Sequence, residues 1–248
     1  MSITDFFGQQ IRLAQSDTGH RAGTDAILLA SLVEASEVGL VVDAGAASGA
    51  AGLCVARRLP SSHVRLIEID QSQIALAQKN IAMNGLTDRV ETLHGDLLGS
   101  YEEREKQGLT KEEADCVITN PPYLDAAAHR ASPDQDRSRA HMMPQEGLTL
   151  WLKSCAAMLK PKGRLHMIHR ADQLSEILSA LPKNFGAIRI IPIHPHEDQP
   201  ATRLLVSATK NSRAPLTLAS GFILHEANGQ FTKKAKALHE GQCGFNDL

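Results

Sequence analysis

An asparagine followed by two prolines and a tyrosine ends one of the apolar runs of this chain. The run covers residues 116–119, and the four residues after it are Asn120, Pro121, Pro122 and Tyr123. Each proline fixes its own φ and lacks an N–H, and Pro121 also keeps Asn120 out of the helical region. A strand that ends in this way presents a rigid edge of oxygen acceptors next to an aromatic ring. Two oxygens and a ring suit a planar –NH2 group, such as a nucleobase amine or a carboxamide.

A turn of small residues follows an earlier apolar run. Residues 39–43 predict a buried strand, residues 44–49 the turn and residues 50–59 a helix. Such a strand, turn and helix N-terminus present backbone N–H groups to a bound carboxylate or phosphate. The spacing departs from the G-x-G-x-x-G pattern of dinucleotide sites and fits D-x-G-x-(G/A)-x-G. The fitting positions are Asp43, Gly45, Ala47 and Gly49. Ala47 occupies the middle G/A position of this pattern, where its methyl group narrows the turn unless its φ is negative, at which alanine is tolerated.

Acidic residues follow the next two predicted strands, which cover residues 63–70 and 89–94. Glu68 is placed where a carboxylate accepts the ribose hydroxyls in strand–helix–strand nucleotide sites. Asp70 is expected to cap the next helix. Asp96 occupies a position that is common for an aspartate in a turn.

Asp43, Glu68, Asp96 and Asn120 thus each follow one of four successive predicted strands. Ligands of doubly wound sheets bind beyond the carboxyl ends of the strands, so these four side chains are expected at one edge of the sheet. From about residue 43 to residue 210 the chain resembles the class I S-adenosylmethionine-dependent amino-methyltransferases that carry an N-P-P-Y motif.

This resemblance implies an α/β fold with a single Rossmann-like class I methyltransferase domain. Its seven-stranded, mostly parallel sheet would be flanked by helices, with short additions at both ends of the chain. The resemblance also implies S-adenosyl-L-methionine as the cofactor, with Asp96 accepting a hydrogen bond from its adenine amine. The implied cofactor-binding residues are Asp43, Gly45, Ala47, Gly49, Glu68, Asp96 and Asn120.

Two further segments are similar to the tRNA1(Val) (adenine(37)-N6)-methyltransferase family. One is Arg-Ala-Gly-Thr-Asp-Ala at residues 21–26, and the other is the tail at residues 222–226 and 231–236. In that family the first segment lies over the cofactor, which implies Thr24 as a cofactor-binding residue. Capping of a helix by Thr24 or Asp25 is the alternative.

A polar segment from Leu124 to about residue 141 follows the N-P-P-Y motif and is long for a loop in a compact domain. Its Arg130, Arg137 and Arg139 are expected to hold the phosphate backbone of a nucleic acid. Two aspartates in the same segment dilute this charge, so a solvated loop is the alternative. The same two alternatives apply to three lysines of the tail, Lys233, Lys234 and Lys236.

Size and composition indicate one α/β domain with small additions. The chain has 248 residues, a mass of 26.8 kDa, a formal net charge of −2 and a pI near 6.6. Nucleic-acid binding must therefore come from a local patch. The four cysteines are widely spaced and predict reduced thiols, and the segment 194–198 is expected to be a loop without a metal. We expect no membrane association and a cytoplasmic location, because we find no signal peptide and no long apolar run.

We divide the chain into a leader of a hairpin and a helix packed on the catalytic domain (1–38), the methyltransferase domain (39–210) and a C-terminal extension (211–248). The expected catalytic residues are Asn120, Pro121 and Tyr123, with Pro122 as part of the substrate-binding scaffold. The reaction expected from the resemblance is methyl transfer to N6 of the adenosine 3′ of the anticodon in a tRNA.

Three alternatives stay open at this point. A protein glutamine N5-methyltransferase of the release-factor type presents the same edge to a carboxamide, but usually carries a larger N-terminal recognition domain. A DNA adenine methyltransferase normally needs a target-recognition domain, for which we find no segment. A non-catalytic RNA- or nucleotide-binding module would keep only the fold.

Overall fold

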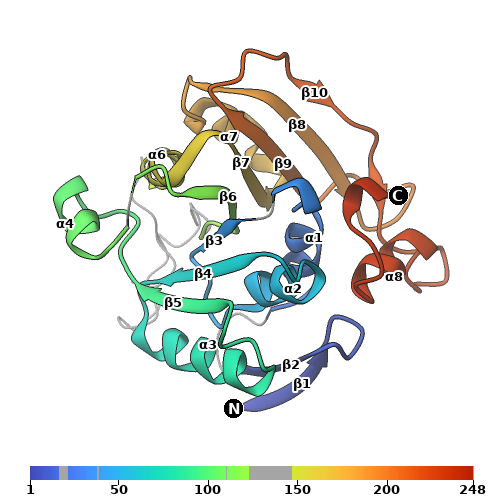
Figure 1. Cartoon of the computed structure of the whole chain (residues 1–248). Helices are drawn as coiled ribbons and strands as arrows, with labels where there is room; N and C mark the ends of the chain where they lie inside the picture. Colours follow the sequence, from blue (N-terminus) through green and yellow to red (C-terminus); the bar gives the residue numbers. More distant parts are fainter. Residues whose placement is uncertain (17–21, 38, 110, 123–146, 248) are drawn as a thin grey trace, which may run out of the picture.

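The computed structural model of this chain describes residues 1–16, 22–37, 39–109, 111–122 and 147–247. Within these residues, one sheet of nine strands runs through the molecule (Figure 1). Its strands are β3 (Leu40–Ala44), β4 (His63–Glu68), β5 (Val90–His94), β6 (Ala114–Thr119), β7 (Leu159–Arg170), β8 (Phe185–His194), β9 (Arg203–Lys210), β10 (Thr217–Leu218) and β11 (Phe222–Ile223).

The strand order is β10-β8-β9-β7-β6-β3-β4-β5, and β11 also pairs with β8. All pairs are parallel except those of β9, which is antiparallel to both β7 and β8. The predicted Rossmann-like, mostly parallel sheet is confirmed. Its seven longer strands, β3 to β9, carry two additional strands of two residues each at the edge.

Strand β8 is the long strand that the sequence pattern does not mark. Gly186 and Pro192 both lie within it, and these two residue types normally interrupt strands. A β-bulge between Gly186 and Arg189 also breaks the alternation of its side chains. Pairing with β9 along most of its length overrides these local signals.

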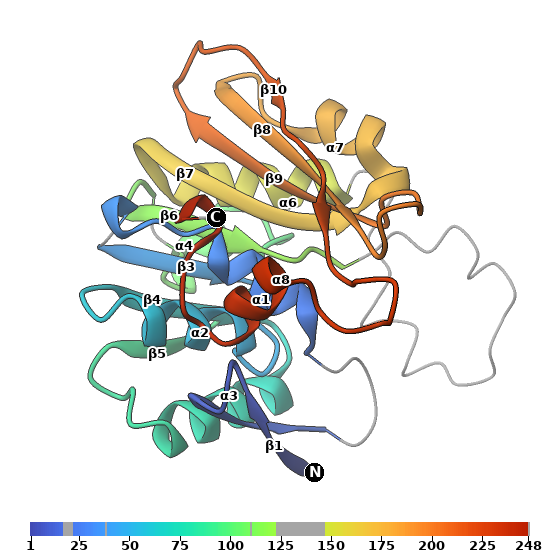
Figure 2. The ribbon, with the colours of Figure 1, turned by 90° about the vertical axis from the view of Figure 1, so that its right-hand side faces the viewer.

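Helices cover both faces of the sheet (Figures 1 and 2). One face carries α1 (Thr24–Ser31), α2 (Ala50–Arg58) and α3 (Gln71–Met83), with α8 (Lys233–His239) packed against α1. The other face carries α4 (Tyr101–Lys106), α6 (Gly147–Met158) and α7 (Leu174–Ala180). Short 3-10 turns complete the chain: η1 (Ala35–Glu37), η2 (Ala171–Gln173) and η3 (Phe245–Asp247). None of the described helices has the length and apolar character needed to cross a bilayer.

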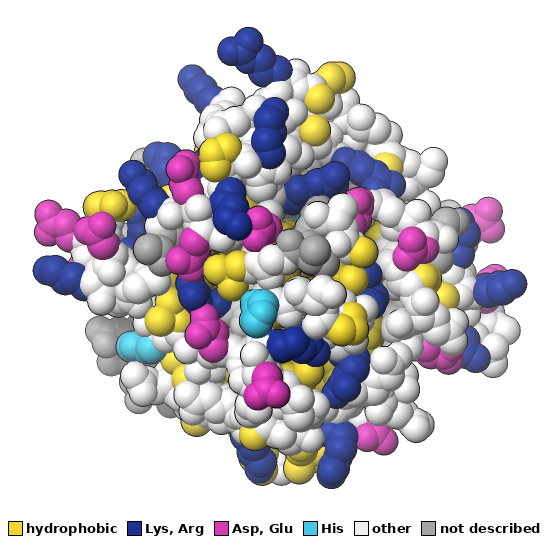
Figure 3. Space-filling view, in the orientation of Figure 1, with side chains coloured by type: hydrophobic (Ala, Val, Ile, Leu, Met, Phe, Trp, Pro, Cys, Tyr) yellow, Lys and Arg dark blue, Asp and Glu magenta, His cyan; other side chains and the backbone are white. Residues whose placement is uncertain are grey.

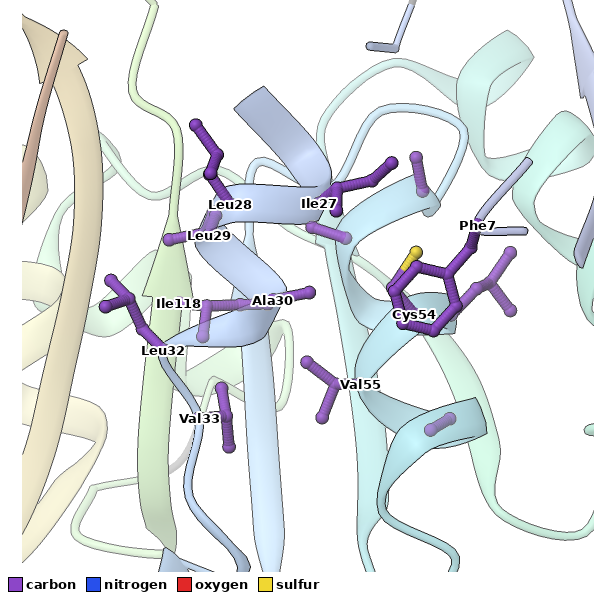
Figure 4. Close-up of a cluster of buried hydrophobic side chains, with 14 of the residues drawn as sticks. Phe7, Ile27, Leu28, Leu29, Ala30, Leu32, Val33, Cys54, Val55 and Ile118 are labelled. Carbon is purple, nitrogen blue, oxygen red and sulfur yellow. The ribbon is translucent and has the colours of Figure 1, made fainter. Parts of the chain in front are cut away.

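Buried side chains on both faces of the sheet hold these layers together. Successive residues of a strand point to opposite faces, so Val41 packs under α1 and α2 while Val42 packs under α6. Figure 4 shows part of the cluster of buried side chains on the face covered by α1 and α2. In this cluster, Phe7 comes from the N-terminal hairpin, Leu29 from α1 and Ile118 from β6. Each fully buried side chain of this size contributes about 1.5–3 kcal/mol.

The N-terminal hairpin, β1 (Ser2–Phe6) and β2 (Ile11–Gln15), is tied to α3 by two asparagine amides. Asn80 is fully buried; its Oδ1 accepts from the Ala14 N–H at 2.7 Å and its Nδ2 donates to the Ala14 carbonyl at 3.0 Å. Asn84, one turn later, makes the same pair of bonds with the backbone of Arg12. Because both backbone groups of each hairpin residue are used, the two amides act like a third strand.

Helix α1 does not begin as predicted. Its N-cap is Gly23, without a side-chain hydrogen bond, so capping by Thr24 or Asp25 is wrong. Tertiary partners engage both side chains instead. Thr24 Oγ1 lies 3.1 Å from His239 Nε2 in α8, and Asp25 pairs with Arg203 of β9 at 3.0 Å.

Candidate active site

The order of the strands reverses between β3 and β6. Strand β3 pairs with β4 on one side and with β6 on the other. Ala44 and Thr119, the last residues of β3 and β6, are direct register partners. The turn that starts at Gly45 and the segment that starts at Asn120 therefore leave the sheet side by side. Such a reversal point is where doubly wound sheets bind their ligands.

The turn after β3 has a left-handed backbone at three positions. Gly45, Ala47 and Gly49 have φ values of +76°, +47° and +86°. Ala47 thus lacks the negative φ at which alanine is tolerated without strain. A non-glycine residue in this region costs about 1–2 kcal/mol. The surrounding structure stabilises this geometry, since the Gly45 and Ala46 N–H groups both donate to the carbonyl of Ile67 at 2.9 Å.

The carboxylate of Glu68 lies at the end of β4 and holds the same turn. Its Oε2 accepts from the Ala47 N–H at 2.8 Å, and its Oε1 accepts from Ile69 N and Asp70 N at 2.9 and 3.0 Å. A carboxylate offers about four acceptor sites, so this arrangement leaves about one for a ribose hydroxyl. If both ribose hydroxyls bound to Glu68, one of them would have to share an acceptor site with a backbone N–H.

Asp70 caps α3, as the sequence predicts. Its carboxylate accepts from Ser72 N and Ser72 Oγ, both at 2.7 Å. These hydrogen bonds to Ser72 lower the pKa of Asp70.

Asp43 lies beneath the turn. Its carboxylate is buried and accepts from the N–H of Gly52 in α2 at 2.9 Å. Burial raises the pKa of Asp43 from 3.8 to about 7, and the nearby charge of Glu68 acts in the same direction. The side chain thus joins β3 to the start of α2, and its direct contact with a cofactor remains a prediction.

Asp96 has the geometry of a turn aspartate. Its Oδ1 accepts from Leu98 N at 2.8 Å, and its own N–H donates to Gln107 Oε1 at 2.9 Å. Because β4 and β5 are parallel neighbours, Asp96 and Glu68 lie at the same edge of the sheet.

Ile69 is a residue of this edge that the sequence reasoning missed. Its side chain is 57% exposed, directly after Glu68. In the sequence pattern, Ile69 looks like an ordinary strand residue. Its position between the carboxylates of Glu68 and Asp70 is the signal that could have identified it. An exposed apolar side chain at the mouth of a polar site provides a contact surface for a flat ring.

Asn120 and the two prolines follow β6. Asn120 and Pro122 are half-buried, while Pro121 is buried. Four predicted site residues lie outside the described residues: Tyr123, Arg130, Arg137 and Arg139.

Trp151 of α6 connects the two segments that leave β3 and β6. Its Nε1 donates to Thr119 Oγ1 at 2.9 Å, and Thr119 Oγ1 donates to the carbonyl of Ala44 at 2.8 Å. Its ring lies so close to Gly45 that a Cβ there would be 2.8 Å from the ring. Trp151 is buried, and Gly45 is required by both its positive φ and this contact.

Thr24 lies on α1, with its hydroxyl directed at His239 of α8. The Nδ1 of His239 lies 2.8 Å from the carbonyl of Ala235 and must donate to it, so its Nε2 accepts from Thr24 in the neutral ring. Burial lowers the pKa of His239, which favours that neutral form. A cofactor contact by Thr24 remains a prediction.

These groups fit a nucleoside-containing cofactor with a charged tail. The carboxylates of Glu68 and Asp96, the exposed side chain of Ile69 and the turn from Gly45 meet at one edge of the sheet. Together with the strand order, they form the arrangement in which doubly wound α/β sheets bind nucleoside cofactors.

The chain belongs to the methyltransferase small domain family, whose model matches residues 16–193. It is 29% identical to the tRNA1(Val) (adenine(37)-N6)-methyltransferase of Porphyromonas gingivalis over 96% of this chain and 94% of that protein. A Pedobacter heparinus protein of the same name is 26% identical over 80% of this chain and 81% of its own length.

A solved structure of an Agrobacterium tumefaciens protein described as a predicted O-methyltransferase is also similar. It is 31% identical, with a TM-score of 0.75, over 89% of this chain and 98% of that one. These findings agree that the protein is an S-adenosylmethionine-dependent methyltransferase.

Proposed function

We propose that this enzyme methylates N6 of the adenosine immediately 3′ of the anticodon in a tRNA of the tRNA1(Val) type. The observation that carries the proposal is the register of β3 and β6. Because Ala44 and Thr119 are register partners, the turn that begins at Gly45 and the acceptor edge that begins at Asn120 lie next to each other. Two relatives named for this reaction match most of the chain, and a tRNA substrate implies a cytoplasmic location.

The chemistry of the acceptor explains the residues at that edge. The lone pair of an exocyclic amine is delocalised into the ring, which makes the amine a weak nucleophile. When Asn120 Oδ1 and the Pro121 carbonyl each accept one N–H of the amine, the nitrogen is drawn toward tetrahedral geometry. Its lone pair is then directed at the methyl group that the cofactor would supply. Alignment of this kind contributes on the order of 7–11 kcal/mol. S-adenosylmethionine, when bound, supplies an electrophilic methyl group on its sulfonium.

Asp43, Gly45, Ala47, Gly49, Glu68, Asp96 and Thr24 form the proposed cofactor site, and Asn120 borders this site with its side chain directed to the acceptor amine. Glu68 holds the ribose and Asp96 the adenine amine in this assignment. Trp151 supports both halves of the site through Thr119 and Gly45.

In the proposal, the substrate base leaves its stack in the anticodon loop at a cost of a few kcal/mol. Stacking on Tyr123 returns roughly 1–3 kcal/mol. Pro122, Arg130, Arg137 and Arg139 form the rest of the substrate site. Residues 1–38 act as a leader, 39–210 as the catalytic domain and 211–248 as an extension.

Two other acceptors have specific support. The edge after β6 also suits the carboxamide of a protein glutamine, and the Agrobacterium tumefaciens relative is described as an O-methyltransferase. We favour the amine of a nucleobase. A hydroxyl has one proton and needs one acceptor, whereas the paired acceptors at Asn120 and Pro121 match two protons. The names of the two relatives favour RNA over protein.

Replacement of Asn120 tests this assignment. Because Asn120 is proposed to act on the acceptor amine, Asn120→Ala should slow methyl transfer to tRNA by about a hundredfold or more. The S-adenosylmethionine Kd, measured by calorimetry, should change little. The exposed Asn184 gives the matched control, and Asn184→Ala should leave both quantities unchanged. Parallel loss of cofactor binding and transfer in Asn120→Ala would make Asn120 a structural residue and would contradict the proposal.

A further inference from the structure

The sheet face under α1 and α8 changes from apolar to polar along its strands. Ile168, Leu205 and Ile191 form one row across β7, β9 and β8, since Leu205 pairs with both isoleucines. All three are buried. The neighbouring row on the same face lies two residues closer to the start of β7. It consists of His166, Ser207 and Arg189, and Ser207 pairs with both of the others. The next row contains Arg164 and its partner Thr209.

A β-bulge places Arg189 in this polar row. Gly186 pairs with Thr209 and Arg189 pairs with Ser207, so β8 carries one more residue than β9 between these pairs. Without that residue, Arg189 would point to the opposite face of the sheet. The bulge contains Ala187 with a φ of +49°, in a conformation that such bulges usually give to glycine. Strained residues of this kind cluster at ligand sites.

The polar rows line a cavity of about 120 Å³. Its polar lining includes Arg164, Arg189, His166, Ser207, Thr209 and Asn246. The cavity is smaller than the roughly 300–1,000 Å³ of sites for drug-sized ligands. It has room for a few waters or one small polyatomic ion.

Positive charge exceeds negative charge around this cavity. Two guanidinium groups, from Arg164 and Arg189, face one carboxylate, from Glu34. Glu34 Oε1 lies 3.6 Å from Arg164 Nη1 and also accepts from the side chain of Asn246. Arg189 Nη1 donates to Asn246 Oδ1 at 2.6 Å.

The deepest polar group is the imidazole of His166, which is 1% exposed. Its Nδ1 lies 2.7 Å from Ser207 Oγ. The imidazole and the hydroxyls of Ser207 and Thr209 offer hydrogen-bonding groups between the two guanidinium groups. A guanidinium fork can donate two parallel N–H groups to two oxygens of a phosphate.

We propose that this cavity is a binding site for a phosphate group. The group is either a phosphodiester of a bound RNA or free inorganic phosphate, since both present the same oxygens. The site is separate from the methyl-transfer site. Arg164 pairs with Cys116, four residues before Asn120 on β6, which corresponds to about 13 Å along the strand.

Calorimetry with inorganic phosphate tests the proposal, with chloride at equal ionic strength as the reference. The wild-type protein should bind phosphate saturably, and Arg189→Ala should raise the phosphate Kd by about tenfold or more. Arg213→Ala removes the same charge from an exposed position outside the cavity lining and should leave the Kd unchanged. The S-adenosylmethionine Kd should be the same in all three proteins, which shows that they are folded.

Absence of saturable phosphate binding in the wild-type protein, or an equal Kd in wild type and Arg189→Ala, would overturn the proposal. Binding of a tRNA transcript identifies the source of the phosphate. If the group belongs to RNA, Arg189→Ala should weaken tRNA binding and reduce the salt slope by about one. If it is free phosphate, tRNA binding should not change. Asn120→Ala should keep phosphate binding, so failure of the proposed function and failure of this site give different results.

Discussion

Ala47 places a methyl group where the left-handed backbone of the cofactor turn favours glycine. Its φ of +47° persists because its N–H donates to Glu68 and its neighbours donate to Ile67. The strain is therefore part of the folded protein before any ligand binds. It reduces stability and leaves the shape of the turn intact.

Replacement of Ala47 by glycine should raise the free energy of unfolding by about 1 kcal/mol, because the strain of the methyl group is removed. The S-adenosylmethionine Kd should stay the same, since the turn already has its final geometry. Urea unfolding and calorimetry measure the two quantities. Ala46 has no positive φ and serves as the control, since Ala46→Gly should destabilise the protein by about 0.5–1 kcal/mol. A destabilised Ala47→Gly variant would contradict this account of the turn.

Helix α3 links the N-terminal hairpin to the cofactor turn through one side chain. Asn80 Nδ2 donates to the Ser48 carbonyl at 2.9 Å, in addition to its two bonds with Ala14. Among the described residues, the side-chain amide of Asn84 bonds to the backbone of Arg12 and to the carbonyl of Asn80. Both asparagines thus hold the hairpin, but of the two only Asn80 also holds the turn.

We expect Asn80→Ala to lower the free energy of unfolding by about 3 kcal/mol or more, because it leaves three buried backbone groups without their partner. Asn84→Ala, at a partly exposed position, should cost about 1 kcal/mol. Only Asn80→Ala should raise the S-adenosylmethionine Kd, since only Asn80 reaches Ser48. Equal effects of both variants on cofactor binding would show that the link from α3 to the turn has no role in binding.

The strand ends that carry Asp43, Glu68, Asp96 and Asn120 could be predicted from the sequence, because each follows an apolar run and a change to turn residues. Other features depend on contacts between distant segments. The hydroxyl of Thr24 meets His239, 215 residues away, so local capping preferences failed there.

Strand β8 and the geometry of the turn were hidden for the same reason. Pro192 and Gly186 argue locally against a strand, and only pairing with β9 overrides them. The positive φ of Ala47 is imposed by acceptors on β4, which no local pattern around residue 47 reveals.

The charge distribution of the whole molecule bears on RNA binding. On the face shown in Figure 3, lysine and arginine side chains are interspersed with aspartate and glutamate, and the formal net charge of the chain is −2. In the proposed function, affinity for RNA must then come from a few local groups, and the tRNA-binding measurement on Arg189→Ala tests whether the cavity with Arg164 and Arg189 is one of them.

Asp43 makes the stability of the whole molecule depend on pH. Burial raises its pKa in the folded protein from 3.8 to about 7, so folding favours the protonated acid. The stabilising contribution is complete below the unfolded pKa and is lost as the pH rises through the folded pKa. From about pH 5 to pH 8, the wild-type protein should lose roughly 2–3 kcal/mol relative to Asp43→Asn. Urea unfolding at both pH values measures this difference.

The exposed Asp88 provides the control for this measurement. Asp88→Asn should follow the pH dependence of the wild-type protein. If Asp43→Asn also follows it, the Asp43 carboxylate titrates equally in the folded and unfolded chains, and its burial has no energetic consequence.

In the proposed reaction, the edge after β6 presents the amine of a tRNA adenine to the methyl group of S-adenosylmethionine. Its most direct test is incubation of the purified enzyme with labelled S-adenosylmethionine and an unmodified valine tRNA transcript, followed by nuclease digestion and nucleoside mass spectrometry. The wild-type enzyme should form N6-methyladenosine at the position immediately 3′ of the anticodon, and Asn120→Ala should form none. Methylation of a ribose oxygen, or an unmodified transcript together with a methylated release-factor glutamine in a parallel reaction, would contradict it.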